Sequence, residues 1–273
     1  MPVLNFNIQQ TLLMKNRNYG RIVFSFDDAR ADSFEAIKIA EQFGIKSTLN
    51  VTTGYVEGAL PESCKDFPVP AMTKEQVLEL SKSKLVEIAC HSHFHKNTFD
   101  DIVRGFEILK KWLGADYELG FVSPGSSVNF AVTPLRMFKE AGFKFVRIGP
   151  RWGKAEKLLR VIRKLSRVFK SDLLFYLGYK GTICNAIDEN FLIHGVPVIH
   201  DNTLEQFKYL VDKACKRENH DVVFIWHSVL DLDAPSGTDN WSWDKNKYVE
   251  LCKYISENLG NNLKSCFTKE LID

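Results

Sequence analysis

Short apolar runs alternate with amphipathic, helix-like segments along the whole chain, and this alternation constrains the fold more than any other feature. The strand-like runs are 21–26, 45–51, 84–90, 119–124, 143–148, 191–199 and 221–226. The helix-like segments between and after them are 33–44, 73–83, 98–114, 132–142, 153–170, 203–217 and 243–260. Such a βα order predicts a parallel sheet covered by helices.

The turn after the first strand decides between two parallel architectures. It reads "FDDARADS" and contains neither GxGxxG nor GxxxxGK[ST], the glycine-rich loops that bind nucleotide phosphates. We therefore expect an α/β fold of another kind, a single distorted (β/α) barrel with about seven parallel strands. The 273 residues lie in the range of single barrels, and 45% of them are hydrophobic, enough for one large core.

No linker divides the sequence, so we expect one domain over residues 1–273. Residues 1–20 would be an N-terminal extension, and residues 240–273 would add a helix and a last strand, the run "LKSCFT". Two internal signals support the helix boundaries: Thr98 and Asp101 have the spacing of a capping box, and Gly114 follows as a stop.

Charge and cysteine usage limit the partners and the compartment. The net charge of +2 gives no global reason to expect nucleic acid binding. The start of the sequence shows no basic segment followed by an apolar one, and no apolar run is long enough to span a bilayer. The six cysteines form no CxxC pair, as expected for reduced thiols. These features predict a cytoplasmic protein.

Polar side chains follow several of the predicted strands, and in a barrel such positions meet on one face. They are Asp27 and Asp28 after the first strand, "HSHFH" (91–95) after the third, and His227 after the last. An isolated Asp pair is usually a helix cap beside a solvated acid, and an isolated histidine is usually a loop residue. Three histidines in five residues favour metal binding, with an oxygen and two imidazoles suited to Zn²⁺ or a similar ion.

Side-chain alternation separates the three histidines. His91 and His95 can point to the same side of an extended or turning segment, while His93 points to the other. We therefore expect His91 and His95 to be metal ligands and His93 to be a packing residue or to support the ligands.

The order of these motifs resembles the polysaccharide deacetylases of carbohydrate esterase family 4. "FSFDD" matches the family's [TS]-F-D-D, "HSHFH" matches H-[ST]-x-x-H, and "SPG" and "FIWH" fall where later motifs are expected. The likeness covers about residues 20–230. It implies a distorted (β/α) barrel and a hydrolase that removes acetyl groups from an N-acetylated sugar in a glycan or a glycan precursor.

The resemblance also implies a division of roles between the acids and histidines. Asp28, His91 and His95 would hold one divalent ion, for which we expect Zn²⁺, with Co, Ni or Fe as alternatives. Asp27 would stay off the metal as the general base, and His227 would be the general acid for the leaving amine. Adjacent carboxylates are compatible when a cation neutralises one of them.

Three further residues are expected to contact the substrate. By the same resemblance, the backbone N–H of Gly125 would stabilise the oxyanion, and Ile225 would line the pocket for the acetyl methyl group. From the residues themselves, Trp241 in "DNWSWD" is a candidate for stacking on a sugar ring, although it and Trp243 can equally pack against the final helix.

The sequence departs from the family in two motifs. Val122 stands where the third motif has an arginine that orients the catalytic acid; Arg147 in the next strand is our preferred replacement, ahead of Arg30. The fourth motif, D-x-x-D-W, is absent from "IGPRWGKAEK" (148–157), so the partner of His227 is not identified; Asp231 and Asp233 are near in sequence but typical of solvated loop acids.

Residues 154–170 form a strongly basic helix-like segment, with seven basic residues and one acid, Glu156. Leu158, Ile162, Leu165 and Phe169 make an apolar stripe. One interpretation places the stripe against the sheet and the basic face in solvent. The other is a surface helix that meets an anionic membrane, a lipid-linked sugar or a phosphate-bearing glycan, so the protein would be peripheral to the membrane.

Two alternatives to the sugar deacetylase stay open. The missing motifs fit a catalytically silent relative that binds glycan or metal, while the retained Asp27 and His227 favour an enzyme. A hydrolase of the same fold acting on a non-sugar amide is the third possibility.

Overall fold

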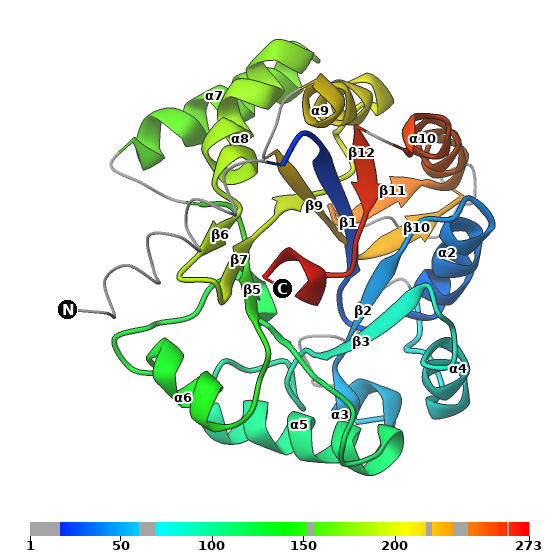
Figure 1. The fold of residues 1–273 in the computed structure, drawn as a ribbon, viewed down its shortest axis with the longest axis vertical. Coiled ribbons are helices and arrows are strands. Elements are labelled where there is room, and N and C mark those ends of the chain that lie inside the picture. The colour runs from blue at the N-terminus through cyan, green and yellow to red at the C-terminus, as the bar shows by residue number, and fades with distance from the viewer. Residues whose placement is uncertain are drawn as a thin grey trace.

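The computed structural model describes residues 17–59, 69–151, 155–216, 220–231, 240–260 and 262–272. The protein has a mixed α/β fold in which a mostly parallel central sheet is surrounded by helices (Figure 1). The strands of this sheet are β1 (Gly20–Phe26), β2 (Ser47–Val51), β3 (Val86–Cys90), β4 (Phe121–Val122), β5 (Val146–Ile148), β6 (Ile187–Asp188), β7 (Leu192–His194), β8 (Val196–Pro197), β9 (Asp221–Trp226) and β12 (Leu263–Ser265).

The strand order is β6-β7-β5-β4-β3-β2-β1-β9-β8, and β12 pairs with β1. Every one of these pairings is parallel except β6 with β7. Each of the predicted apolar runs contains a strand, and the run 191–199 contains two. A separate pair of short parallel strands, β10 (Ser228–Leu230) and β11 (Ser242–Asp244), follows the last long strand.

The two ends of this strand order are consecutive in the chain. β7 pairs with β5 and β8 pairs with β9, and only Gly195 separates them. The N–H of Gly195 donates to the carbonyl of Ile148 (3.2 Å), and the N–H of Val198 donates to that of Ile225 (2.9 Å). A Cβ on Gly195 would lie 2.7 Å from the side chain of Ile225, so glycine is required at this crossing. One short segment thus bonds to both edges of the sheet.

The helices cover the outside of the strands (Figure 1). They are α2 (Ala31–Gln42), α3 (Thr53–Val56), α4 (Lys74–Leu80), α5 (Phe99–Leu113), α6 (Leu135–Glu140), α7 (Glu156–Val168), α8 (Asp172–Cys184), α9 (Leu204–Lys216) and α10 (Lys245–Asn258), with 3-10 turns η2 (Pro124–Ser126) and η3 (Lys269–Leu271). All seven predicted helices are present. α8 was not predicted because its sequence is apolar on most sides and has no clear helical period.

Two apolar layers lie on the two faces of the sheet. The larger one packs the strands against the helices and includes Phe24, Phe224 and Trp226. The smaller one, on the other face, contains Val23 and Val223 and is covered by Leu271 of the C-terminal turn. Because side chains alternate along a strand, the residues on this inner face continue as polar groups toward the carboxyl ends of the strands.

The interpretation that places the apolar stripe of the basic helix α7 against the sheet is wrong for most of that stripe. Its buried residues are Arg163 and Ser166, while Leu158, Leu165 and Phe169 are exposed. The physical reason is that the apolar α8 lies between α7 and the strands (Figure 1). α7 therefore packs on α8, and its apolar side chains face outward.

Arg163 fixes this packing. Its Nε donates to the carbonyl of Gly178 (2.8 Å), and its guanidinium lies 4.3 Å from the centre of the Tyr179 ring. A Cβ on Gly178 would come within 2.7 Å of the Arg163 side chain, so the close approach of the two helices depends on that glycine.

Candidate metal and catalytic site

Strand register brings Asp27 and His227 together. β1 and β9 are parallel, with Phe26 opposite Trp226, so the residues that follow them leave the sheet side by side. The N–H of Asp27 donates to the carbonyl of Trp226 (2.8 Å), and Oδ2 of Asp27 lies 3.9 Å from Nε2 of His227. The Asp27 side chain is only 2% exposed.

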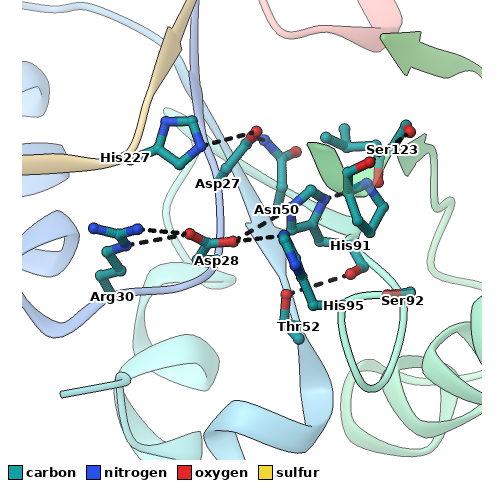
Figure 2. A network of polar contacts seen from close by, with 12 residues as sticks. Asp27, Asp28, Arg30, Asn50, Thr52, His91, Ser92, His95, Ser123 and His227 are labelled. Atoms are coloured by element: carbon teal, nitrogen blue, oxygen red, sulfur yellow. Dashed lines mark hydrogen bonds and ion pairs between the residues drawn. The ribbon is translucent and has the colours of Figure 1, made fainter. Parts of the chain in front are cut away.

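The neighbouring Asp28 has different surroundings. The backbone turns at this residue with φ of 73°, and its carboxylate is held on one side by Arg30, whose Nε donates to Oδ2 (3.2 Å). The other oxygen, Oδ1, lies 3.4 Å from Nε2 of His91 and 3.3 Å from Nε2 of His95. Figure 2 shows Asp28 between the guanidinium and the two imidazoles. The two adjacent acids are thus held apart by separate partners.

The loop that carries the histidines is shaped by Asp101. Its carboxylate accepts backbone N–H bonds from His93 (3.2 Å), Phe94 (2.9 Å) and Lys96 (3.2 Å). The predicted capping box is therefore wrong: Thr98 is at the N-cap of α5, but its side chain makes no capping hydrogen bond, because the partner acid is bonded to the loop instead. Gly114 does end the helix, with φ of 106°.

The hydrogen bond of His91 determines which nitrogen can bind a metal. Its Nδ1 lies 2.8 Å from the carbonyl of Val122, and because a carbonyl oxygen only accepts, this nitrogen carries the hydrogen. In the neutral imidazole, Nε2 then presents a lone pair toward Oδ1 of Asp28. That oxygen is buried, and no described residue donates a hydrogen bond to it. Two facing acceptors at this distance are stabilised when a cation lies between them.

The donor spacing fits a small divalent ion. Asp28, His91 and His95 form a group whose ligand atoms all lie within 4.8 Å of one another. Donors placed about 2.0–2.1 Å from a tetrahedral Zn²⁺ would lie roughly 3.4 Å apart, close to the 3.3 and 3.4 Å that separate the carboxylate oxygen from the two imidazoles. His93 lies on the other side, with Nδ1 2.9 Å from the hydroxyl of Thr53.

Burial and neighbouring charges shift the pKa values of several of these groups in opposite directions. Burial alone raises the pKa of Asp28, but the contacts with His91 and His95 outweigh it and hold this pKa well below its usual range. Burial lowers the pKa of His95, but its bond to Asp28 outweighs this and the pKa is raised. For His227, burial wins over the nearby carboxylates and lowers the pKa to about 4.

Arg147 lies against Asp27 and is fully buried. It stands directly opposite Val122 in the pairing of β5 with β4. The resemblance expects an arginine at position 122 to orient Asp27, and here the guanidinium of Arg147 reaches Asp27 from the next strand. Arg30, the second candidate, contacts Asp28 instead.

Sequence reasoning missed Asn50. Its Nδ2 donates to Oδ1 of Asp27 (2.8 Å) and to the hydroxyl of Ser25 (2.8 Å). The available signal was an amide near the carboxyl end of a buried strand, since buried amides are retained where they have partners.

The three residues expected to contact the substrate differ in exposure. Gly125 is exposed in η2 and adopts φ of 61°. Ile225 is buried in β9, on the inner face that also carries His227. The indole of Trp241 is 40% exposed, and its centre lies 4.6 Å from the centre of the His227 ring. Trp243, in contrast, is buried and donates to a backbone carbonyl.

The fourth family motif has no counterpart within the residues that the structure describes. Nδ1 of His227 is buried and has no hydrogen-bond partner there. Asp233 and residues 152–154, part of the segment where that motif was expected, lie outside the described ranges.

Comparisons with known proteins give structural but not sequence matches. No family model and no curated protein sequence matches the chain. Among solved structures, it is similar to PdaA of Bacillus subtilis, a family 4 carbohydrate esterase, with 13% identity, a TM-score of 0.47, and coverage of 97% of this chain and 85% of that one.

Two further structures illustrate the range. A family 4 carbohydrate esterase from Streptomyces lividans, in complex with acetate, has 12% identity, a TM-score of 0.44 and coverage of 90% of both chains. A family 4 pseudoenzyme from Bacillus anthracis has 9% identity and a TM-score of 0.47, with coverage of 94% of this chain and 67% of that one. All three of these structures are described as belonging to carbohydrate esterase family 4.

Proposed function

We propose that this protein is a metal-dependent hydrolase that removes acetyl groups from an N-acetylated sugar. The observation that carries the proposal is that the imidazoles of His91 and His95 converge on Oδ1 of Asp28, to which no described residue donates a hydrogen bond. This group lies directly beside the Asp27–His227 pair. A divalent ion held by Asp28, His91 and His95, for which Zn²⁺ is our first choice, would polarise the acetyl carbonyl and acidify a water molecule.

The remaining residues would move the proton. Asp27, oriented by Arg147 and Asn50, would accept it from the attacking water as the new carbon–oxygen bond forms. His227, with a pKa of about 4, is neutral at pH 7. It would therefore first receive that proton from Asp27, 3.9 Å away, and then give it to the leaving nitrogen, which returns Asp27 to its charged form. Breaking the carbon–nitrogen bond would then yield acetate and the free amine.

Substrate contacts would complete the site. The N–H of Gly125 would donate to the carbonyl oxygen as negative charge develops on it. Ile225 would contact the acetyl methyl group, and Trp241 would stack on the sugar ring beside His227.

We further propose that the sheet closes as a distorted barrel within a single domain. The bonding of segment 192–198 to both β5 and β9 supports this closure. The inner apolar cluster supports it as well, because a filled interior is typical of small barrels.

The proposed cytoplasmic location is supported by Cys90, Cys252 and Cys266, which are buried free thiols.

Metal analysis tests the proposal most directly. We expect about one Zn²⁺ per chain in the untagged protein, and loss of the ion in His91→Ala. In the same preparations, wild type should release acetate from N-acetylglucosamine oligosaccharides, and Asp27→Asn should bind metal normally without turnover. Absence of any bound ion after titration with Zn²⁺ and Co²⁺ would contradict it.

The same assays separate the alternatives. A catalytically silent relative would bind the oligosaccharides and release no acetate from any of them. A hydrolase of non-sugar amides would release acetate from N-acetylated amino acids or polyamines but not from sugars. The missing arginine at position 122 was one reason to consider a catalytically silent relative. Arg147 lies opposite that position and pairs with Asp27, which favours the enzyme.

We also propose that the protein docks on an anionic membrane surface. The docking surface would be the α7–α8 apolar face, defined here by the exposed residues Leu158, Val161, Leu165, Val168, Phe169, Leu173 and Leu177. Two basic residues, Lys157 and Lys170, lie near it in the sequence. A second copy of the chain would bring like charge to this face, whereas anionic lipid is complementary to it. No helix among the described residues is long and apolar enough to span a membrane.

Vesicle sedimentation tests this docking. Replacing Leu158, Val168 and Phe169 by serine should reduce binding to vesicles with 30 mol% phosphatidylserine by roughly tenfold, since each side chain buries apolar surface. The control replaces Val132 and Val249, exposed apolar residues outside the face. Equal binding of the triple variant and wild type would sink the proposal, as would a wild type that dimerises through this face in analytical ultracentrifugation.

A further inference from the structure

A cleft of about 740 Å³ lies between α7 and the candidate catalytic residues. Four cations of α7 line one side of it, Arg160, Arg163, Lys164 and Arg167. We propose that this cleft binds a phosphate group carried by the substrate, so that the sugar which is deacetylated is a phosphoester. The identity of the sugar rests on the proposed function; the phosphate site does not.

The spacing of the cations places them together. Positions 160, 163, 164 and 167 recur at three or four residues and therefore share one face of a helix. This is the face that turns away from the exposed apolar side chains and toward the body of the protein. Four of the five basic residues of α7 thus line the cleft.

The guanidinium of Arg163 is held in a fixed position at this wall. Its side chain is anchored by the bond to the Gly178 carbonyl and by the Tyr179 ring, which also lines the cleft. A cation whose geometry is set by protein contacts loses little entropy when it binds an anion. An arginine guanidinium can also donate two parallel N–H hydrogen bonds to one phosphate group.

Among the described residues, two acids lie near this charge. Glu156 pairs with Arg160 along the helix, and Asp201 lines the cleft from the other side. Within the described part of the chain, neither Lys164 nor Arg167 forms an ion pair with a carboxylate. The lining that the structure describes thus holds four cationic side chains and one carboxylate, although the whole protein is close to neutral.

The cleft shares one side chain with the surroundings of the candidate catalytic site. Trp241 lines it, and the same indole lies 4.6 Å from the His227 ring. Ser126, the residue after Gly125, lines it as well, and so does Pro197, which pairs with Ile225 in the sheet. A sugar resting on Trp241 with its acetyl group at His227 would therefore have an adjoining substituent directed into the cationic cleft.

The volume agrees with a group larger than a single ion. Sites for small molecules and cofactors usually enclose about 300–1,000 Å³. The lining includes Phe175, Tyr179 and Ile199 beside the cations. Apolar walls next to fixed positive charge suit a phosphoester with a second, less polar substituent. A soluble sugar phosphate and a lipid-linked sugar share this phosphate chemistry.

Binding of inorganic pyrophosphate tests the cleft without any sugar. We expect wild type to bind it in isothermal titration calorimetry, and Lys164→Glu with Arg167→Glu to weaken binding at least tenfold. The matched control is Lys157→Glu with Lys180→Glu, which makes the same charge change at exposed helix positions that do not line the cleft. Equal affinity in the two double variants, or no binding by wild type, would overturn the proposal.

Sugar ligands then link the cleft to the catalytic site. In the Asp27→Asn variant, N-acetylglucosamine 1-phosphate should bind at least tenfold more tightly than N-acetylglucosamine, and the two cleft substitutions should remove that difference. A phosphate gain that survives them would contradict the assignment. Failure of deacetylation with intact pyrophosphate binding would reject the proposed function alone.

A third comparison identifies the source of the phosphate. Acetate release is measured from the soluble sugar phosphate and from the same sugar joined through phosphate to a short polyprenyl chain in vesicles. Preference for the lipid form supports a membrane substrate, and preference for the soluble form supports a free sugar phosphate. Both results support phosphate recognition, whereas a neutral sugar hydrolysed as fast as either would contradict it.

Discussion

The two ends of the same strands are built on different rules. At the amino ends, Arg21 of β1 and Asp221 of β9 face each other in register and share two hydrogen bonds of 2.9 and 2.8 Å. Arg21 also donates to the carbonyls of Glu270 and Leu271, which close this end of the sheet. At the carboxyl ends, Oδ1 of Asp28 and Nδ1 of His227 are buried and have no hydrogen-bond partner among the described residues.

This difference separates stability from chemistry. A buried charge that is fully paired holds its surroundings in place, and removing one partner is costly. A buried polar atom without a partner destabilises the fold unless something outside the chain binds it. The carboxyl ends therefore carry the features expected of a ligand-binding site, and the amino ends carry those of a structural closure, the usual division in (β/α) barrels.

The largest expected effect comes from Asp27→Asn. If the carboxyl-end acids serve chemistry, this change should lower kcat for acetate release by about 10³-fold or more, because an amide cannot accept the proton. The melting temperature should fall as well, because the fully buried Arg147 loses its charged partner, so kcat is expressed per folded molecule. Measurement combines steady-state acetate release with calorimetry. A variant that keeps its activity would remove Asp27 from the mechanism.

Asp221→Asn is the matched change at the other end. It leaves Arg21 buried without its charged partner, so we expect a loss of about 3–5 kcal/mol in the free energy of unfolding. The kcat per folded molecule should be unchanged. Urea denaturation and active-site-normalised kinetics provide the two readouts. A stable variant with low kcat would show that the comparison between the two ends is mistaken.

Moving the arginine tests how Asp27 is positioned. Arg147→Val should lower kcat by about 100-fold, since a misplaced base is inefficient. Because Val122 and Arg147 are opposite each other in the sheet, the combined change Val122→Arg, Arg147→Val returns the guanidinium to the position of the family motif. We expect at least tenfold recovery of kcat. A purely structural role would restore stability without restoring kcat.

The sequence was sufficient where the pattern is local. Strand and helix order followed from apolar periodicity, and the placement of Asp28, His91 and His95 on one face followed from their positions after strands. The orientation of α7 could not be predicted, because it depends on α8, an apolar helix that competes for the same surface. Asn50 was missed because its role depends on a cross-strand hydrogen bond that single-sequence patterns do not contain.

The smallest predicted effect concerns Glu87, a buried acid at the amino ends that does not follow the rule of full pairing. It accepts a bond from the Thr48 hydroxyl (2.8 Å), but its Oε1 has no partner, and burial raises its pKa to about 7. In the unfolded chain this carboxyl ionises near pH 4.5. Between pH 4.5 and 7 the folded state therefore holds a proton that the unfolded state has lost, and stability must fall as pH rises through this window.

Glu87→Gln removes the titrating group while keeping its shape. Its free energy of unfolding should equal that of wild type within about 1 kcal/mol near pH 4, and should exceed it by roughly 3 kcal/mol at pH 8, the value expected for a shift of this size. Urea denaturation at pH 4, 6 and 8 measures the difference. Parallel curves for the two proteins would mean that Glu87 ionises normally in the fold. The amino ends would then be uniform in structure, and the contrast with the unpartnered atoms of the candidate site would be stronger than the present contacts indicate.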